Sequence, residues 1–267
     1  MRNTVEFIGY YGGDTTVACS AWTSTDRELS NTKKARIGKM LDMLWSNEHE
    51  TPFEKGIVHF LVDTDIASHI HLLKHRISSL NAESARYKEL KEDKYFLPED
   101  WGDVKLSKDA EVIVNLPHKV LFYPAVSHAL FATEGDKWSD VLKDYTELGN
   151  KLYHQCVEDL TSALGRKRAK ESARFFKTYN SQIQADVMFN MRSFANFVKL
   201  RNSEHAQLEI REIAQQMLSL VTNIDGEPFK ETLATFEKRW SKERDVNALH
   251  LKIKELEKQL EGYRKND

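Results

Sequence analysis

Residues 57–63, with the sequence IVHFLVD, decide the fold class of this chain. The segment is short, rich in β-branched and aromatic residues, and preceded by the turn-forming pair Thr51-Pro52, so it predicts a β-strand. Residues 65–77 follow with a helical pattern, and residues 111–116 form a second strand candidate. Because strands and helices do not alternate as regular βαβ units, we expect an α+β protein with a small, mainly antiparallel sheet wrapped by long helices.

Helical spacing of apolar residues accounts for most of the remaining chain. It predicts helices over residues 32–45, 138–164, 189–201 and 204–222. In the longest of these, the expected apolar stripe consists of Trp138, Val141, Leu142, Tyr145, Leu148, Leu152, Cys156 and Leu160. For the last of them, Ser203 is the expected N-cap and Glu204 the acidic residue of the first turn.

The C-terminal segment differs from the rest of the chain. Its apolar residues recur in steps of three and four, and they are Val246, Leu249, Ile253, Leu256, Leu260 and Tyr263. This spacing is that of a coiled-coil seam over about three heptads, which is the lower limit for such a prediction. We therefore expect a main domain over residues 1–235 and a helical tail over residues 236–267. The tail is either an amphipathic helix docked on its own domain or a small oligomerisation helix.

Composition excludes several classes of protein. The 267 residues include 39 Lys and Arg against 41 Asp and Glu, which is not the basic excess of a dedicated DNA-binding protein. No run of 18 apolar residues predicts a membrane span, and the N-terminus lacks the apolar stretch of a signal peptide. The two cysteines are too few for a disulfide framework. We expect a cytoplasmic protein, or one of the host cytoplasm if the source is viral, with no nucleic-acid or membrane partner.

Two polar clusters are candidates for chemistry. Residues 74–87, KHRISSLNAESARY, combine a cationic triplet with a Ser-x-Arg pair, whose hydroxyl and guanidinium are suited to hold a phosphate. A solvated basic helix end is the alternative interpretation of this cluster. In the second cluster, Arg192 and Asn196 are four residues apart and share a helix face, with Asn190 and Arg201 nearby.

Other chemistries lack their motifs. The chain has no Gly-rich nucleotide-binding loop, no HExxH and no CxxC. His69, His71 and His75 are close in sequence, but no Cys or carboxylate stands at ligand spacing beside them, so we predict no metal site. Cys19 and Cys156 have no nucleophile context and are expected to be small core residues.

Three ordered blocks resemble the flavin-dependent thymidylate synthase family. The pair His75-Arg76, seven residues and then Ser84 resemble the family signature Arg-His-Arg, seven residues, Ser. The segments 49–54 (HETPFE) and 95–98 (YFLP) look like its flanking blocks. The pattern over 190–210, from Asn190 through Arg201 to Ile210, looks like the family's second block almost position by position. The resemblance covers about residues 5–230.

The resemblance implies an enzyme that converts dUMP to dTMP with FAD, NADPH and methylenetetrahydrofolate. It implies a homotetramer with active sites where subunits meet. The residues implied for FAD are His49, Thr51, Lys74, His75, Arg76, Asn190, Arg192 and Asn196. Those implied for dUMP are His71, Lys74, Ser84, Ala85 and Arg86, with Arg174 from another subunit, and Arg201 as the residue that orients and polarises the uracil ring.

Physical chemistry agrees with these roles. A phosphate dianion needs several fixed donors, which Ser84, Arg86 and Arg174 supply. A guanidinium on the uracil carbonyl oxygens stabilises the enolate-like charge that develops during transfer to C5, and this is the expected catalytic role of Arg201. Because neither cysteine has a nucleophile context, the expected route uses no cysteine and leaves reduction to the flavin.

Three departures from the family pattern lie near the expected nucleotide. Lys74 replaces the first Arg of the signature and removes its bidentate fork. Ala82-Glu83 stands where an acidic residue usually comes first, and His71 replaces a common Gln. An alternative is therefore a related flavin and folate enzyme that modifies another pyrimidine monophosphate or makes a hydroxymethyl product. A remote alternative is a non-enzymatic RNA- or protein-binding module that uses residues 74–86.

Overall fold

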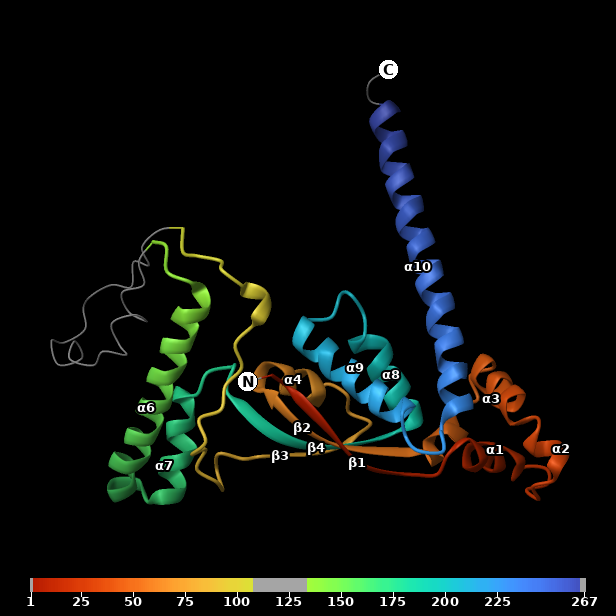
Figure 1. Ribbon diagram of the computed structural model, residues 1–267, viewed down its shortest axis with the longest axis horizontal. Helices are drawn as coiled ribbons and strands as arrows, with labels where there is room; N and C mark the ends of the chain where they lie inside the picture. Colours follow the sequence, from red (N-terminus) through yellow and green to blue (C-terminus); the bar gives the residue numbers. More distant parts are fainter. Residues whose placement is uncertain (1, 108–133, 265–267) are drawn as a thin grey trace. The chain divides into compact units, whose positions relative to one another are not determined.

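The computed structural model describes residues 2–107 and 134–264 (Figure 1). The chain divides into two compact units, of which the first contains Met1–Glu6 and Phe60–Val187 and the second Phe7–His59 and Met188–Asp267. A four-stranded antiparallel sheet has the order β1-β2-β4-β3, and the α+β class is confirmed. Its strands are β1 (Thr4–Tyr11), β2 (Ile57–Asp65), β3 (Ser79–Ala82) and β4 (Gln182–Asn190).

Strand β2 confirms the strand predicted at residues 57–63 and extends it to Asp65. Strand β4, which is not among the predicted elements, has a buried residue at every second position from Ala185 onward, namely Ala185, Val187 and Phe189. The candidate strand at 111–116 lies outside the described residues.

Within its described residues, the first unit contains the helices α4 (Ile66–Leu73), α6 (Trp138–Leu164) and α7 (Arg166–Ala173), and 3-10 turns at Glu99–Trp101 and Arg174–Phe176. Asp65 caps α4 by accepting the N–H of Ser68 at 2.8 Å, and Asn3 donates to the same carboxylate at 2.7 Å. The helix ends at Leu73, four residues earlier than predicted, because the chain turns at Lys74 and His75. This turn sets the position of the cationic triplet.

Helix α6 has the predicted bounds but buries a different face. Its buried residues are Thr146, Gly149, Asn150, Tyr153 and Val157, whereas Trp138, Tyr145 and Leu152 of the predicted stripe are exposed. Gly149 explains the choice, because a Cβ there would lie 2.5 Å from the carbonyl oxygen of Phe176. The buried polar residues are hydrogen-bonded, Thr146 to Asn180 at 3.1 Å and Asn150 to Lys177 at 2.8 Å.

The second unit contains the remaining helices, which are α1 (Asp14–Trp22), α2 (Asn31–Lys34), α3 (Ile37–Ser46), a 3-10 turn at Thr51–Lys55, α8 (Met191–Arg201), α9 (Leu208–Thr222) and α10 (Lys230–Arg264). The predicted helix 32–45 is thus two helices. The aromatic core of the second unit includes Trp45, Phe53 and Phe236, with ring centroids 4.5 to 5.5 Å apart.

Helix α9 corrects one predicted start. It begins at Leu208 after Gln207, so Ser203 is not its N-cap. Ser203 instead stabilises a turn between α8 and α9, where its hydroxyl accepts the N–H of His205 at 3.3 Å.

Helix α10 runs without interruption from Lys230, earlier than residue 236, where the tail was expected to begin. The carboxylate of Asp14 caps it by accepting the N–H groups of Glu231 and Thr232 at 2.8 and 2.9 Å. Phe236 and Trp240 are buried in the core of the second unit. Across the described stretches, every helix is too short or too polar to cross a membrane.

Candidate active site

Ser84, Ala85 and Arg86 lie in a tight turn directly after β3. The carbonyl oxygen of Ser84 accepts the N–H groups of Tyr87 and Lys88, both at 3.0 Å. Glu83 attaches the start of this turn to β4, because its N–H donates to the Gln184 carbonyl at 2.9 Å and its carboxylate accepts the Gln184 N–H at 3.1 Å. The carboxylate of Glu83 therefore has a structural partner in the first unit.

Arg86 is held by helix α7. Its guanidinium donates to Glu171 at 3.0 Å, and this hydrogen bond raises the pKa of Arg86 and lowers the pKa of Glu171. Lys170 of the same helix donates to the carbonyl oxygen of Tyr87 at 2.7 Å. The Arg86 guanidinium also lies 5.8 Å from the centroid of the Tyr87 ring. Arg86 stays exposed, so its position is defined while it remains accessible to an anion.

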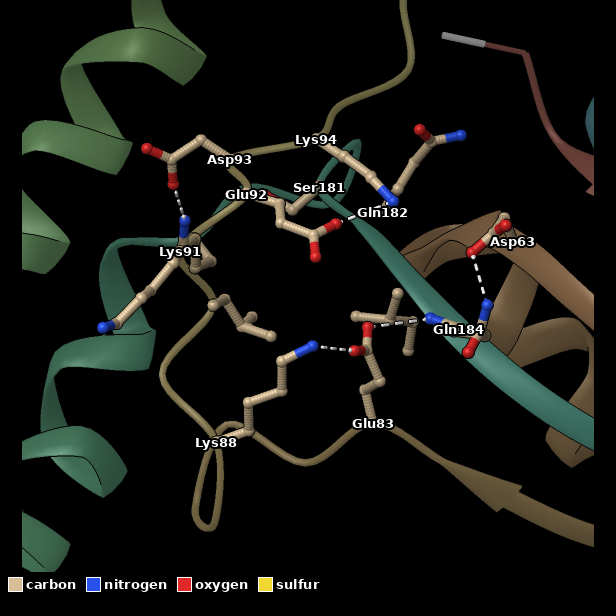
Figure 2. Close-up of a pocket in the computed structure, with 13 residues that line it drawn as sticks. Asp63, Glu83, Lys88, Lys91, Glu92, Asp93, Lys94, Ser181, Gln182 and Gln184 are labelled. Carbon is tan, nitrogen blue, oxygen red and sulfur yellow. Dashed lines mark hydrogen bonds and ion pairs between the residues drawn. The ribbon is translucent and has the colours of Figure 1, made fainter.

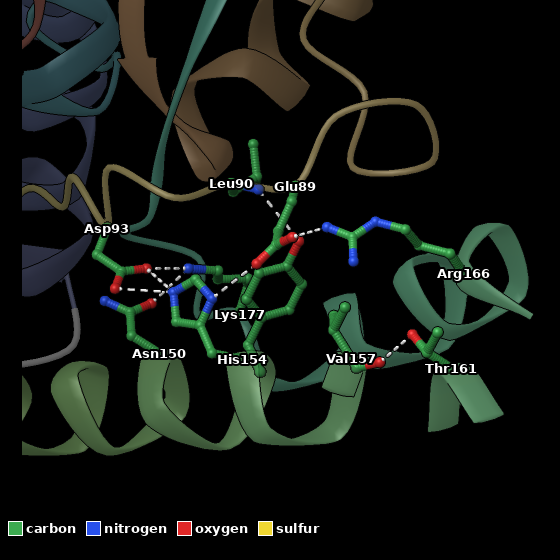
Figure 3. Close-up of polar contacts among 10 residues, drawn as sticks. Glu89, Leu90, Asp93, Asn150, His154, Val157, Thr161, Arg166 and Lys177 are labelled. Carbon is green, nitrogen blue, oxygen red and sulfur yellow. Dashed lines mark hydrogen bonds and ion pairs between the residues drawn. The ribbon is translucent and has the colours of Figure 1, made fainter. Parts of the chain in front are cut away.

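Polar contacts with α6 and with Lys177 hold the segment that follows the Ser84–Arg86 turn, as Figure 3 shows. Asp93 pairs with Lys177 at 2.6 Å and with His154 Nε2 at 3.0 Å. The ammonium of Lys177 also donates to Asn150 at 2.8 Å and lies 4.5 Å from the centroid of the Tyr153 ring. The side chain of Lys177 is only 4% exposed, so this ion pair is shielded from solvent on the lysine side.

Further bonds attach the same segment to α6 and α7. Glu89 accepts from Arg166 at 2.7 Å, and the Leu90 N–H donates to the Tyr153 hydroxyl at 3.1 Å. Tyr95 donates to Glu147 at 2.9 Å, and burial together with this bond raises the pKa of Tyr95 to about 12. The segment 83–95 is thus attached on both sides of the Ser84–Arg86 turn.

A small cavity lies beside this segment (Figure 2). Its volume is about 120 Å³, below the roughly 300 Å³ at which small-molecule sites begin. Two of the lysines in its wall are paired with carboxylates there, Lys88 with Glu83 at 2.8 Å and Lys94 with Glu92 at 2.7 Å. Ser84 and Arg86 do not line it, so the cavity is not itself the predicted phosphate site.

The cationic triplet follows α4 in the first unit. Lys74 and Arg76 are exposed, whereas His75 is buried and its carbonyl oxygen accepts from Ser78 at 2.6 Å. His71 is half-buried in the last turn of α4, and Arg174 is exposed in the 3-10 turn after α7. The first unit therefore carries two outward cations of the triplet and all of the residues predicted for the phosphate.

The second unit carries the other predicted flavin residues. Arg192 donates to Glu50 at 2.9 Å and to Glu54 at 2.7 Å, and these hydrogen bonds, that to Glu54 first, raise the pKa of Arg192. His49 and Thr51, both exposed, flank Glu50 in sequence. The arginine is therefore positioned next to the predicted His49–Thr51 segment of its own unit.

Helix α8 presents the predicted polar face. Arg192 and Asn196 are exposed, Phe194 and Phe197 are buried, and Arg201 is half-buried at the last residue of the helix. Asn190 caps α8, with its side-chain oxygen accepting the Ser193 N–H at 2.8 Å. Its side-chain NH₂ is then the group suited to a ligand.

Sequence reasoning missed the carboxylates that hold the two arginines. Glu171 is 85 residues from Arg86, and Glu50 is 142 residues from Arg192. No local pattern connects residues at such separations, so only the fold identifies these pairs. A second hollow of about 760 Å³ in the second unit, formed by residues of 12–16, 34–42 and 226–238, contains none of the predicted residues.

Comparison with known proteins agrees with the sequence blocks. Residues 6–225 match the family described as Thymidylate synthase complementing protein. The flavin-dependent thymidylate synthase of Pseudothermotoga lettingae is 25% identical over 223 residues, 84% of this chain and 86% of that protein. The enzyme of the same name from Thermosipho melanesiensis is 29% identical over 213 residues, 80% of this chain and 82% of that protein.

Among solved structures, the UMP/dUMP methylase PolB from Streptomyces cacaoi, bound with 5-Br dUMP, has the same fold. The TM-score is 0.62 at 22% identity, with 88% of this chain and 95% of that chain covered. Because the family match spans most of the chain and includes every predicted site residue, the chain belongs to the thymidylate synthase complementing protein family of flavin-dependent thymidylate synthases.

Proposed function

We propose that this protein methylates dUMP to dTMP, with methylenetetrahydrofolate as the one-carbon donor, NADPH as the reductant and FAD as the flavin. The observation that carries the proposal is the Ser84–Arg86 turn, attached to β4 and held by α7, in a chain of this family. Family relatives bear the name flavin-dependent thymidylate synthase, which supports the reaction.

The turn provides the donors that a nucleotide phosphate needs. The Ser84 hydroxyl, the backbone N–H of Ala85 and the Arg86 guanidinium lie within three consecutive residues. In the proposed complex a phosphate oxygen takes the place of part of the Glu171 interaction with Arg86. We propose that Arg174 of a second copy supplies a further guanidinium and that His71 and Lys74 also contact the nucleotide.

The donors predicted for FAD fit the chemistry of that molecule. Lys74, Arg76 and Arg192 are exposed cations suited to a pyrophosphate, and Asn190 and Asn196 offer neutral amides to ring or ribityl oxygens. His49, Thr51 and His75 complete the proposed set. When bound, the flavin supplies the reducing chemistry, and the protein residues bind and orient.

Arg201 is the proposed catalytic residue. Its guanidinium, at the end of α8, is proposed to bind the carbonyl oxygens of the uracil ring and to stabilise the negative charge that develops there. The proposed reaction needs no cysteine nucleophile.

Exposed aromatic residues beside the predicted phosphate-binding residues support a site that is completed by a second copy of the chain. Near Arg86 and Arg174, the side chains of Tyr87, Phe175 and Tyr179 are 74, 82 and 69% exposed. Large aromatic residues are enriched at the contacts between protein chains. We propose a homotetramer in which a second copy covers these residues and completes each site.

The test is an assay of the purified protein with methylenetetrahydrofolate and NADPH, with product mass as the readout. We expect a yellow protein that adds 14 mass units to dUMP. UMP and dCMP are run in parallel, because PolB is described as a UMP/dUMP methylase and because Lys74 and His71 depart from the family pattern. A product 30 mass units heavier than the substrate would indicate hydroxymethylation, and a colourless protein that takes up no FAD would contradict the proposal.

A further inference from the structure

The described side chains that anchor helix α10 in the second unit belong to its first half. Phe236 and Trp240 are buried, the Arg239 guanidinium lies 5.5 Å from the centroid of the Trp45 ring, and Glu243 pairs with Lys199 at 2.7 Å. Beyond Glu243 the helix extends past α1, α3, α8 and α9 of the same unit (Figure 1). This second half lies outside residues 6–225, which match the family.

The second half presents an apolar seam to solvent. Val246, Leu249, Ile253 and Leu256 are 51, 58, 44 and 50% exposed. Their steps of three, four and three place them on one face of the helix, as positions a, d, a and d of two heptads. Single exposed apolar residues are normal, but four in register along one face mark an interaction surface.

We propose that this seam pairs with the same seam of a second copy of the chain as a parallel, two-stranded coiled coil. The residue types support this choice of partner and orientation. β-Branched residues, Val246 and Ile253, occupy the a positions, and Leu249 and Leu256 occupy the d positions. This combination favours two parallel strands over higher assemblies.

Charges beside the seam are complementary in the same arrangement. Lys252 stands at position g, and Glu257 at the following position e, and both are exposed. In one helix these residues are five apart and do not face each other. In a parallel pair, each Lys252 faces Glu257 of the partner subunit, so the two flanks of the seam each carry one ion pair.

The length of the seam predicts a reversible interaction. The four exposed residues span two heptads, and the sequence continues the spacing to about three, which is close to the lower limit for a coiled coil. The pairing is therefore weak compared with that of long coils. The anchored first half of α10 compensates in part, because the helix is already formed and loses little conformational freedom on pairing. Trapping the pair covalently is therefore the sharpest experiment.

The full-length Leu256→Cys variant tests the register. Residues at d face each other in a parallel pair, within the Cα separations that a disulfide accepts, whereas in an antiparallel pair d faces a. Mild oxidation should yield a peptide linked through position 256 of both copies, identified by mass spectrometry so that Cys19 and Cys156 do not interfere. The matched control is Lys254→Cys, on the exposed face away from the seam. Equal linkage at 254, or none at 256, would overturn the proposal.

Seam and charge variants in the Leu256→Cys background test the interaction itself. Leu249→Lys with Ile253→Lys should lower the linked yield at least tenfold, with an unchanged circular dichroism spectrum as the folding control. Lys252→Glu alone should lower it less, and adding Glu257→Lys should restore it by exchanging the two charges. Unchanged yield in the Leu249→Lys, Ile253→Lys variant, or linkage of position 256 to a different protein, would contradict pairing between copies. None of these readouts depends on enzymatic activity.

Discussion

Arg86 and Arg192 share one arrangement at the residue scale. Both guanidinium groups are exposed and predicted to bind a ligand, and both have carboxylate partners, Glu171 for Arg86 and Glu50 with Glu54 for Arg192. Such partners hold a long side chain in place before a ligand binds. The side chain then loses less conformational entropy on binding the ligand. An anionic ligand must compete with the carboxylate, so these pairs adjust affinity as well as position.

Arg201 gives the sharpest residue-scale prediction for activity. Arg201→Ala should reduce dUMP methylation by about a thousandfold, within the range seen when a group that stabilises transition-state charge is removed. Flavin absorbance of the purified variant should match that of the unmodified protein. Turnover is measured by product mass, and Lys199→Ala, an exposed residue of the same helix, is the control. Normal turnover by the Arg201→Ala protein would remove this residue from the mechanism.

His69 predicts how stability depends on pH. It is buried, and burial lowers its pKa below the usual 6.5. Below that pH the unfolded chain takes up a proton at His69 that the folded chain resists. Stability is therefore complete above the unfolded pKa and is lost as pH falls toward the lowered folded pKa.

His69→Gln should flatten this part of the pH profile, measured as urea midpoints at several pH values on either side of 6.5. His205→Gln, which changes an exposed histidine, serves as the control. If both variants kept the same slope as the unmodified chain, His69 would not be its source.

At the element scale, the contacts of α6 with the segment 83–95 determine how firmly the phosphate turn is placed. Lys177→Met removes the buried ammonium, so Asn150 loses a donor and Asp93, of its two partners named above, keeps only His154. We expect a loss of about 1–3 kcal/mol in unfolding free energy, together with weaker dUMP binding.

The control for Lys177→Met is Arg166→Ala, because Arg166 makes an exposed ion pair with Glu89. Exposed pairs contribute at most about 1 kcal/mol, so this variant should be close to the unmodified protein. Chemical denaturation and calorimetric titration measure the two quantities. An equal effect of both substitutions would mean that the burial of Lys177 adds nothing to stability or to dUMP binding beyond what an exposed ion pair contributes.

The junction of α1 and α10 supports a second element-scale prediction. Asp14 accepts two backbone N–H groups of α10 and the Thr232 hydroxyl at 2.7 Å. Asp14→Ala should cost about 1–2 kcal/mol in unfolding free energy, as for other lost helix caps. Asp14→Asn keeps an acceptor oxygen and should cost less. Denaturation midpoints that do not distinguish Ala from Asn would rule out the capping role.

For the whole molecule, we predict that the proposed site does not depend on the part of α10 after Glu243. The described contacts of α10 with its unit, including Phe236, Arg239, Trp240 and Glu243, precede residue 244. A chain that ends at Glu243 should therefore unfold within about 0.5 kcal/mol of the full chain, as surface changes generally do. Its dUMP affinity should be unchanged. Calorimetric titration and denaturation check both values, and loss of nucleotide binding would show that the tail supports the site.

The sequence by itself determined the features that depend on near neighbours. Periodicity predicted the bounds of α6, the strand at residue 57 and the shared face of Arg192 and Asn196, because these follow from the geometry of a helix turn or a strand repeat. The blocks around Ser84 and Asn190 identified the family, since chemical groups at defined spacing are visible in the chain.

Only the tertiary structure decided which groups are buried together. It placed Glu171 against Arg86, and Glu50 and Glu54 against Arg192, across separations that no local pattern connects. It also chose the face of α6 that is buried, because Gly149 permits close backbone approach and Thr146 and Asn150 find hydrogen-bond partners there. Apolar periodicity indicates which face of a helix is hydrophobic. Burial of that face depends on which other elements pack against it, and this packing is a property of the folded chain.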